Sequence, residues 1–321
     1  MIIPYNIDVM IKKLIIPVLI FASAVVIAAD NPVGGDPNSA DTKPVEQKVE
    51  QPAAVTAEPN NTVLPQAAVY VDNTLNSKCR GVLNNEFIDD GGYVDYKLLR
   101  RKRSQLYDIV REFEKLEVDQ YIKWESDDQT AFWINAHNIM TMKLIVDNYP
   151  IQSSRFKLIF YPGNSIMQID GARQSNYFNI MGREYSLEEL EKNVLELYKD
   201  PRVLFALNYA SLGSAPMRNE PYIGRELETQ IDNQVRKLLV RRTGFYIDKS
   251  VLSLSPIFEW HIKEFTEYYG TDVRYRAHPK ETRAIFNFIE KFKGQGWSKI
   301  LESDKFELRY QNFDWRLNEK P

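Results

Sequence analysis

The chain contains one set of residues with the types needed for catalysis by a hydroxyl nucleophile: Ser214, His261 and Glu264. A serine hydroxyl is a weak nucleophile until a positioned base takes its proton, and a histidine oriented by a carboxylate is a common base. His261 and Glu264 are three residues apart, so they share one face of a predicted helix. The catalytic hypothesis is therefore a Ser214–His261–Glu264 triad, although the Gly-x-Ser-x-Gly elbow that presents many such serines is absent. The competing interpretation makes Ser214 a turn residue and His261 a partner of its helix neighbours.

Other reaction types lack the residues that they require. The single cysteine, Cys79, excludes an intramolecular disulfide and a Cys-rich zinc site. Three histidines leave little material for a His-based metal site. The sequence has no Gly-x-Gly-x-x-Gly, no Walker loop and no His-Glu-x-x-His. We therefore expect neither a metal ion nor a cofactor.

A helix predicted over residues 129–148 carries Asn135, His137 and Asn138 among apolar residues that cover nearly all of its sides. A helix that is apolar all round is buried. A buried amide without a partner costs about 1–3 kcal/mol. Asn135 and Asn138 share a face and therefore either tie neighbouring loops to the core or line a cleft, and the tie is the favoured interpretation.

Periodicity and punctuation predict the other elements. Asp127 or Asp128 is the expected cap of the helix over 129–148, and Ser186 and Glu189 form a capping box. Large aromatic residues at apolar positions predict that Trp133, Trp260 and Trp315 belong to the core. Helices and hairpin strands without βαβ alternation indicate an α+β fold, a predominantly helical single domain with a few short, mainly antiparallel strands. The expected elements are helices at 95–116, 186–199, 225–240, 255–268 and 280–292, a buried strand at 203–207, a loop at 208–216, a hairpin of 245–247 with 251–254, and an extended aromatic segment at 306–317.

Several segments, in order, resemble the domain-of-unknown-function 547 family over roughly residues 83–318. They read Ala-Phe-Trp-Ile-Asn-Ala-His-Asn at 131–138, Asp-Pro-Arg at 200–202 with Phe-Ala-Leu-Asn-Tyr-Ala-Ser at 205–211, Pro-Met-Arg-Asn-Glu-Pro-Tyr at 216–222, Leu-Ser-Pro-Ile-Phe-Glu-Trp at 254–260, and Phe-Asp-Trp-Arg-Leu-Asn at 313–318. The resemblance implies a domain common in exported bacterial proteins, without a settled activity. If these segments border a cleft, its amides and aromatics suit a peptide or a sugar; the candidate binding residues are Asn135, Asn138, Asn208, Ser211, Arg218 and Trp260.

The chain also departs from the family pattern. Where the family commonly reads Asn-Cys-Ala-Ser-x-Gly-Cys-Pro, residues 208–215 read Asn-Tyr-Ala-Ser-Leu-Gly-Ser-Ala, so both cysteines are replaced. Leu204 and Lys192 stand where the family often has histidine. If relatives use a thiolate with an imidazole, this chain has lost that chemistry. We therefore expect a non-catalytic binding or scaffolding domain. The alternatives are a hydrolase of envelope peptides or glycans that uses Ser214 and His261, and a purely structural domain.

The N-terminal residues predict export. Lys12 and Lys13 precede an uncharged run at 14–29 that ends in small residues, which is typical of a secretory signal over residues 1–29. The run is shorter than the ~20 residues that span a bilayer, so cleavage is favoured over an uncleaved anchor. Residues 30–69 are rich in proline and alanine and have no aromatic residue, which predicts a disordered linker. Residues 70–321 remain as one globular domain.

Composition limits the partners of this domain. A chain that is 44% hydrophobic and 26% charged can build a buried core. A net charge of −3 gives no strong attraction to nucleic acid or to anionic lipid. We expect a periplasmic or secreted protein whose partner is an envelope peptide or glycan, and which contacts a membrane only through the signal segment if that segment is uncleaved.

Overall fold

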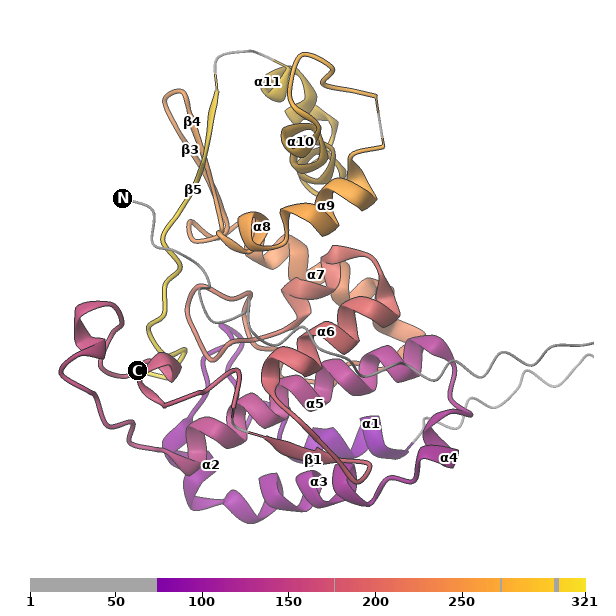
Figure 1. The fold of residues 1–321 in the computed structure, drawn as a ribbon, viewed down its shortest axis with the longest axis vertical. Helices are drawn as coiled ribbons and strands as arrows, with labels where there is room; N and C mark the ends of the chain where they lie inside the picture. The colour runs from indigo at the N-terminus through magenta and orange to yellow at the C-terminus, as the bar shows by residue number, and fades with distance from the viewer. Residues whose placement is uncertain (1–73, 176, 272, 303–305) are drawn as a thin grey trace, which may run out of the picture. The chain divides into compact units, whose positions relative to one another are not determined.

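Helix α5, Ser126–Asp147, runs through the larger of two hydrophobic cores in this computed structural model (Figure 1). Almost all of its residues are buried, so the prediction of a buried helix is confirmed. The structure describes residues 74–175, 177–271, 273–302 and 306–321, and the predicted signal and linker lie outside them. The helices that pack on α5 are α1 (Thr74–Lys78), α2 (Tyr96–Arg101), α3 (Arg103–Lys115) and α6 (Leu187–Tyr198).

The second core is built on a three-stranded sheet. Strand β4 (Val251–Leu254) pairs antiparallel with β3 (Phe245–Asp248), as the predicted hairpin requires, and parallel with β5 (Glu307–Tyr310). Figure 1 shows these strands in the upper part of the picture beside the helices of the second core. Those helices are α8 (Ile257–Trp260), α9 (Ile262–Tyr269), α10 (Lys280–Lys293) and α11 (Ser298–Leu301), with the 3-10 turn η7 (Gln295–Trp297).

Two elements contribute side chains to both cores: the 3-10 helix η5 (Pro201–Ala206) and helix α7 (Leu227–Leu239). In η5, Val203 packs into the first core and Phe205 into the second. The predicted strand at 203–207 is therefore wrong. The Asp200 carboxylate accepts the Arg202 N–H, and Pro201 occupies the first helical position, which starts a helical turn. The apolar run that suggested a strand reflects burial on all sides.

Three further predictions are corrected. The helix predicted at 95–116 is interrupted at Lys102, and the one at 255–268 is interrupted at His261, which has φ −118° and ψ 28°. Helix α5 begins after Glu125, and neither predicted aspartate caps it; the Asp128 carboxylate instead accepts the Gly224 N–H at 3.0 Å. The capping box of α6 is confirmed. Elements that the sequence did not predict are α1, α11, η7, the hairpin β1 (Phe178–Ile180) with β2 (Arg183–Tyr185), α4 (Val118–Tyr121), and the 3-10 turns η2 (Cys79–Gly81), η3 (Lys157–Ile159), η4 (Ile166–Gln168) and η6 (Gly224–Glu226).

The α+β fold class, mostly helical with short and mainly antiparallel strands, is confirmed. Within the described residues, no helix combines the length and the apolar character needed to cross a membrane.

Residues 208–217, which we call the motif loop, run between the two cores and are nearly all buried. The C-terminal segment pairs with this loop: the Leu212 N–H donates to the Arg316 carbonyl and the Gly213 N–H to the Asp314 carbonyl, each at 2.9 Å. A Cβ on Gly213 would lie 2.9 Å from the Asp314 nitrogen, so the close approach of the two segments requires glycine.

The buried amides of α5 hold the chain on either side of the motif loop. Asn135 accepts the Tyr222 N–H at 2.9 Å and donates to the Tyr222 carbonyl at 2.8 Å. Asn138 donates to the Ala206 carbonyl at 2.9 Å and accepts the Asn208 N–H at 2.8 Å. Both side chains bond to backbone, which is the loop-tying arrangement that the sequence favoured.

We expect Asn135→Ala to lower the free energy of unfolding by about 2 kcal/mol, because it leaves the buried N–H and C=O of Tyr222 without partners. Urea denaturation monitored by circular dichroism measures this change. Asn179→Ala, which removes an exposed amide in β1, is the control and should change the free energy by less than about 0.5 kcal/mol. Equal stability of the two variants would contradict the role assigned to Asn135.

Candidate functional site

The Ser214 hydroxyl is committed to the motif loop. It accepts the Tyr209 N–H at 3.0 Å and lies 3.0 Å from the Ser211 hydroxyl, and the residue is only 1% exposed. Within the described residues, no hydrogen bond joins Ser214 to a histidine. The hydroxyl therefore closes a turn and lacks the base that would make it a nucleophile.

His261 belongs to a buried charge cluster with Arg173 and Glu191. One Glu191 oxygen accepts from the Arg173 guanidinium at 2.7 Å, and the other lies 3.3 Å from His261 Nε2. The predicted neighbour Glu264 lies 4.0 Å from His261 Nδ1. Burial raises the pKa of Glu191, but Arg173 and His261 outweigh it and lower the pKa to about 2. The structure thus brings His261 to two carboxylates, whereas the Ser214 hydroxyl bonds elsewhere.

Tyr209 of the motif loop fills the space beside this cluster. The Arg173 guanidinium carbon lies 4.5 Å from the centre of its ring, within cation–π distance. The His137 ring meets the same ring edge-on, 6.0 Å between centres. Burial, followed by the charge of Glu191, raises the pKa of the Tyr209 phenol well above its usual value. A buried neutral phenol at this place supplies no nucleophile at neutral pH.

His137 is a buried neutral histidine. Its Nδ1 lies 3.3 Å from the Asn138 amide oxygen, and burial lowers the pKa of the imidazole to about 4. Its ring packs edge-on against the Tyr209 ring, and no hydrogen bond joins it to a hydroxyl or a thiol among the described residues.

Three aromatic side chains next to the buried charge cluster form what we call the aromatic ledge: Trp260, Phe313 and Trp315. The planes of the two indoles are inclined by 20°, and their ring centres are 6.1 Å apart. The ring centre of Phe313 lies 5.0 Å from that of Trp260 and 4.5 Å from that of Trp315. Trp260 is 38% exposed, which corrects the prediction that it belongs to the core; Trp133 is buried as predicted. Phe313 also contacts the Tyr209 ring, so the ledge lies against the filled site.

The side chains of the remaining candidate binding residues form bonds within the protein. Asn208 donates to the Ala215 carbonyl at 3.0 Å and accepts the Ala210 N–H at 2.9 Å. Ser211 bonds to Ser214. Arg218 is nearly buried, pairs with Glu220 and lies over the Tyr222 ring at 5.5 Å. The structure therefore places Trp260, of the six, on an accessible surface.

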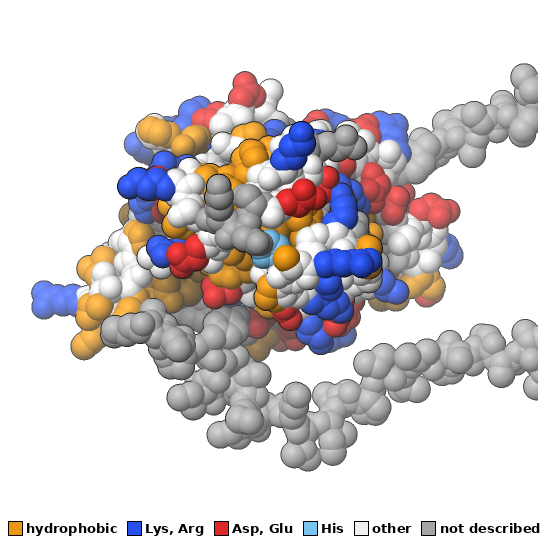
Figure 2. Space-filling view, turned by 90° about the horizontal axis from the view of Figure 1, so that it is seen from above, with side chains coloured by type: hydrophobic (Ala, Val, Ile, Leu, Met, Phe, Trp, Pro, Cys, Tyr) orange, Lys and Arg blue, Asp and Glu red, His pale blue; other side chains and the backbone are white. Residues whose placement is uncertain are grey.

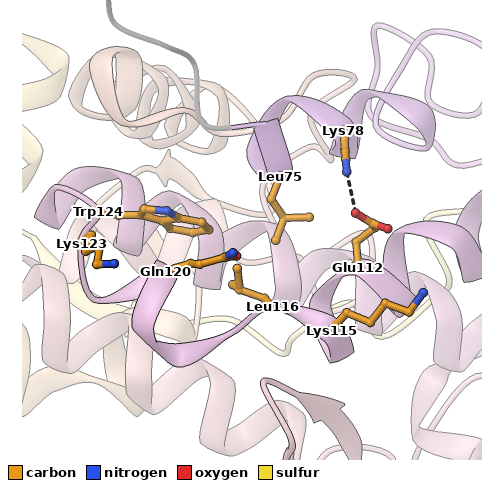
Figure 3. A pocket seen from close by; sticks show the side chains of 8 residues that line it. All are labelled: Leu75, Lys78, Glu112, Lys115, Leu116, Gln120, Lys123 and Trp124. Atoms are coloured by element: carbon orange, nitrogen blue, oxygen red, sulfur yellow. Dashed lines mark hydrogen bonds and ion pairs between the residues drawn. The ribbon is translucent and has the colours of Figure 1, made fainter.

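A hollow on the described surface lies away from the motif loop, at helices α1, α3 and α4 (Figure 3). It has a volume of about 640 Å³, and the Lys78–Glu112 ion pair of 2.6 Å lies at its edge. Exposed ion pairs of this kind contribute little to the free energy of folding. The polar residues that line this hollow are exposed or half-buried, so none of them is a buried polar group that points to a ligand. The lining residues are Leu75, Lys78, Glu112, Lys115, Leu116, Gln120, Lys123 and Trp124. The described residues hold no group of three or more His, Cys, Asp or Glu side chains that is arranged for a metal ion.

The sequence did not single out Arg173 or Glu191 as site residues. For Glu191 a signal was present: it lies on the buried stripe of α6 with Leu187, Leu190 and Val194, where an acidic residue requires a buried cation. Arg173 precedes β1 in a turn and carries no periodic signal.

One family model matches this chain. Residues 121–239 match the family described as Protein of unknown function, DUF547. The match covers α5, α6, η5, the motif loop and α7, so it confirms the resemblance over these elements. No curated protein and no solved structure matches the chain.

We expect Glu191→Gln to lower the free energy of unfolding by about 3 kcal/mol, because it removes the buried carboxylate that pairs with the partly buried Arg173 guanidinium. Chemical denaturation at pH 7 measures the change. Glu196→Gln on the same helix is the control; its ion pair with Lys192 is exposed, so the expected change is below about 0.5 kcal/mol. Similar stability of both variants would mean that Glu191 does not hold the cluster together.

The depressed pKa of His137 predicts a loss of stability in mild acid. Below the usual pKa of about 6.5 the unfolded chain takes up a proton on this imidazole, whereas the folded chain does so only near pH 4. Stability from His137 is therefore present above pH 6.5 and decreases as the pH falls towards 4. Between pH 7 and pH 5 the expected loss is about 2 kcal/mol. Denaturation at the two pH values measures it, and His137→Gln should remove most of the difference. A difference that His137→Gln leaves unchanged would assign it to other groups.

Proposed function

We propose that this chain is an exported, non-catalytic binding domain of the bacterial cell envelope, and that its aromatic ledge binds a peptide or a glycan. The observation that carries the proposal is the pair of stacked indoles, of which Trp260 is accessible, on a rigid backing. Exposed tryptophans pack against the apolar faces of sugars and against apolar peptide side chains, and they lose little conformational entropy when they do so.

The absence of catalysis in this proposal rests on the contents of the site. Tyr209 and Ser214 stand where the family pattern has cysteines, the first as a buried phenol and the second as a turn hydroxyl. His261 is held by Glu191 and points a nitrogen at a carboxylate rather than at a nucleophile. Without a nucleophile and a base in contact, acyl or glycosyl transfer through these groups has no first step.

The rigidity of the ledge supports a binding role. Its two C-terminal members flank Asp314, whose carbonyl accepts the Gly213 N–H. The third member, Trp260, ends α8 and precedes His261 of the buried charge cluster. A surface whose side chains are already held in place loses less entropy on binding.

The exported location in this proposal rests on the sequence of residues 1–29, which lie outside the described residues. Two lysines before a short apolar run that ends in small residues form the pattern of a secretory signal. An envelope location makes cell-wall peptides and glycans the available ligands of the kind that the ledge fits.

The test is a screen of cell-wall peptides and glycan fragments for binding by isothermal titration calorimetry, followed by Trp260→Ala. We expect Trp260→Ala to weaken binding of a positive fragment at least about tenfold, because a central aromatic contact typically carries that much of an interface. Tyr177→Ala removes an exposed aromatic side chain elsewhere and should leave affinity unchanged.

Two results would contradict the proposal. One is equal binding by Trp260→Ala and the unaltered chain, which would place the ligand elsewhere. The other is hydrolysis of a fragment by the purified protein that Ser214→Ala abolishes, which would make the domain an enzyme.

A further inference from the structure

The segment between α5 and β1 ends in an exposed apolar tip, formed by Phe156, Leu158, Ile159 and Phe160. These side chains are 83%, 48%, 74% and 70% exposed, respectively. Leu158 and Ile159 belong to the 3-10 turn η3, and Phe156 and Phe160 flank it. Figure 1 shows this segment extending to the left of the helices that surround α5. Four large apolar side chains kept in water within five residues are unusual for a soluble surface and mark a contact site.

The base of this segment is fixed. Gln168 is buried and its side chain reaches both sides of the loop: it accepts the Ser154 N–H at 2.9 Å and donates to the Tyr161 and Pro162 carbonyls at 3.2 and 3.1 Å. Lys157 donates to the Gln168 carbonyl at 3.1 Å. These hydrogen bonds fix the conformation of the segment at its base, so the fold itself keeps the tip exposed.

The charge of this segment is weakly positive, against the negative net charge of the chain, because one of its two basic residues is paired with an acidic one. The sequence has no acidic residue between Asp147 and Asp170, and the charged residues in this interval are Arg155 and Lys157. Lys157 pairs with Asp170 at 2.6 Å, while Arg155 is exposed beside Phe156. Apolar side chains next to a basic one suit the headgroup interface of an anionic membrane, where the apolar groups insert and Arg155 is attracted to the negative headgroups.

The projecting form of the tip favours a lipid surface over a protein. A stable protein interface buries about 800 Å² on each partner and needs a broad complementary surface. Figure 2 shows hydrophobic side chains together with a projecting basic one at the left edge of the face, on the side where Figure 1 places this segment, and mixed charged, polar and hydrophobic side chains over the rest. A narrow convex tip offers little area to a protein, whereas a bilayer accepts a few inserted side chains from any such tip.

We propose that the apolar tip inserts into the headgroup region of an anionic lipid bilayer and docks the domain on the membrane surface. From the sequence, membrane contact was expected only through an uncleaved signal segment, and the tip is a second contact that does not depend on that segment. The tip is also connected to the aromatic ledge, because Tyr161 meets Trp315 edge-on with 6.2 Å between ring centres. Docking by the tip would therefore hold the ledge near the membrane.

The experiment places an environment-sensitive fluorescent thiol label at the tip of the full chain, as Phe160→Cys. The native Cys79 is fully buried, and the unaltered chain treated with the dye measures any labelling there. The matched control is Val240→Cys, because Val240 is 79% exposed at the end of α7, away from the tip. Vesicles of phosphatidylcholine, with and without phosphatidylglycerol, are then titrated in.

We expect the label at 160 to shift to shorter wavelength on vesicles containing phosphatidylglycerol, and the label at 240 to stay unchanged. Adding Phe156→Ser and Ile159→Ser to the labelled chain should weaken partitioning of the tip at least about tenfold, since both substitutions remove apolar area that would leave water. These side chains are exposed, so the thermal midpoint should be unchanged.

Three results would overturn the proposal. The first is no shift at 160 on either vesicle. The second is a shift without vesicles that grows with protein concentration, which would assign the tip to a second copy of the chain. The third is a vesicle-dependent shift that the two serine substitutions leave intact.

Discussion

A buried loop must find a partner for every backbone N–H and C=O that it removes from water, and this constraint organises the described domain. The chain from η5 to η6 runs between two hydrophobic cores, where backbone pairing with the C-terminal segment supplies some of those partners. Side chains supply others: Asn135, Asn138, Asn208 and Ser214 each bond to backbone groups of this segment. From α7, Gln230 donates to the Pro221 carbonyl and Gln234 to the Pro216 carbonyl. Several of the residues that carry the resemblance to the DUF547 family therefore stabilise the fold by pairing its buried backbone groups.

This constraint explains what the sequence could predict. The asparagines of α5 stood out because an amide inside an all-apolar helix has to be paired, and that reasoning uses only local composition. The position of Asp128 could not be read in the same way, because its partner, the Gly224 N–H, is distant in sequence. The strand predicted at 203–207 failed for a related reason. An apolar run between two cores lacks periodicity, so the cap formed by Asp200 and Pro201 decides its conformation.

The candidate site was less predictable than the fold because it depends on pairings between distant segments. The charge cluster joins Arg173 from a turn, Glu191 from α6 and His261 from the junction of α8 and α9. Of the three, only Glu191 could be noticed from the sequence, because it is an acidic residue on the buried stripe of α6. Tyr209 follows from the same geometry. A tyrosine in place of a small cysteine needs room, and the ring takes it against the Arg173 guanidinium, the His137 imidazole and Phe313. The ring thus occupies volume next to the carboxylate and the imidazoles that a reacting group would need.

Because the Tyr209 ring fills the interior of the candidate site, the accessible part of the site is the aromatic ledge on its outer side. The C-terminal segment pairs with the motif loop and carries Phe313 and Trp315, so the same hydrogen bonds that satisfy the loop also position the ledge. Tyr161 extends this connected surface from Trp315 to the loop that bears the apolar tip. An aromatic surface for a ligand and an apolar tip with basic neighbours therefore belong to one continuous set of packed side chains. If both proposals hold, docking of the tip would keep a ligand on the ledge close to a membrane.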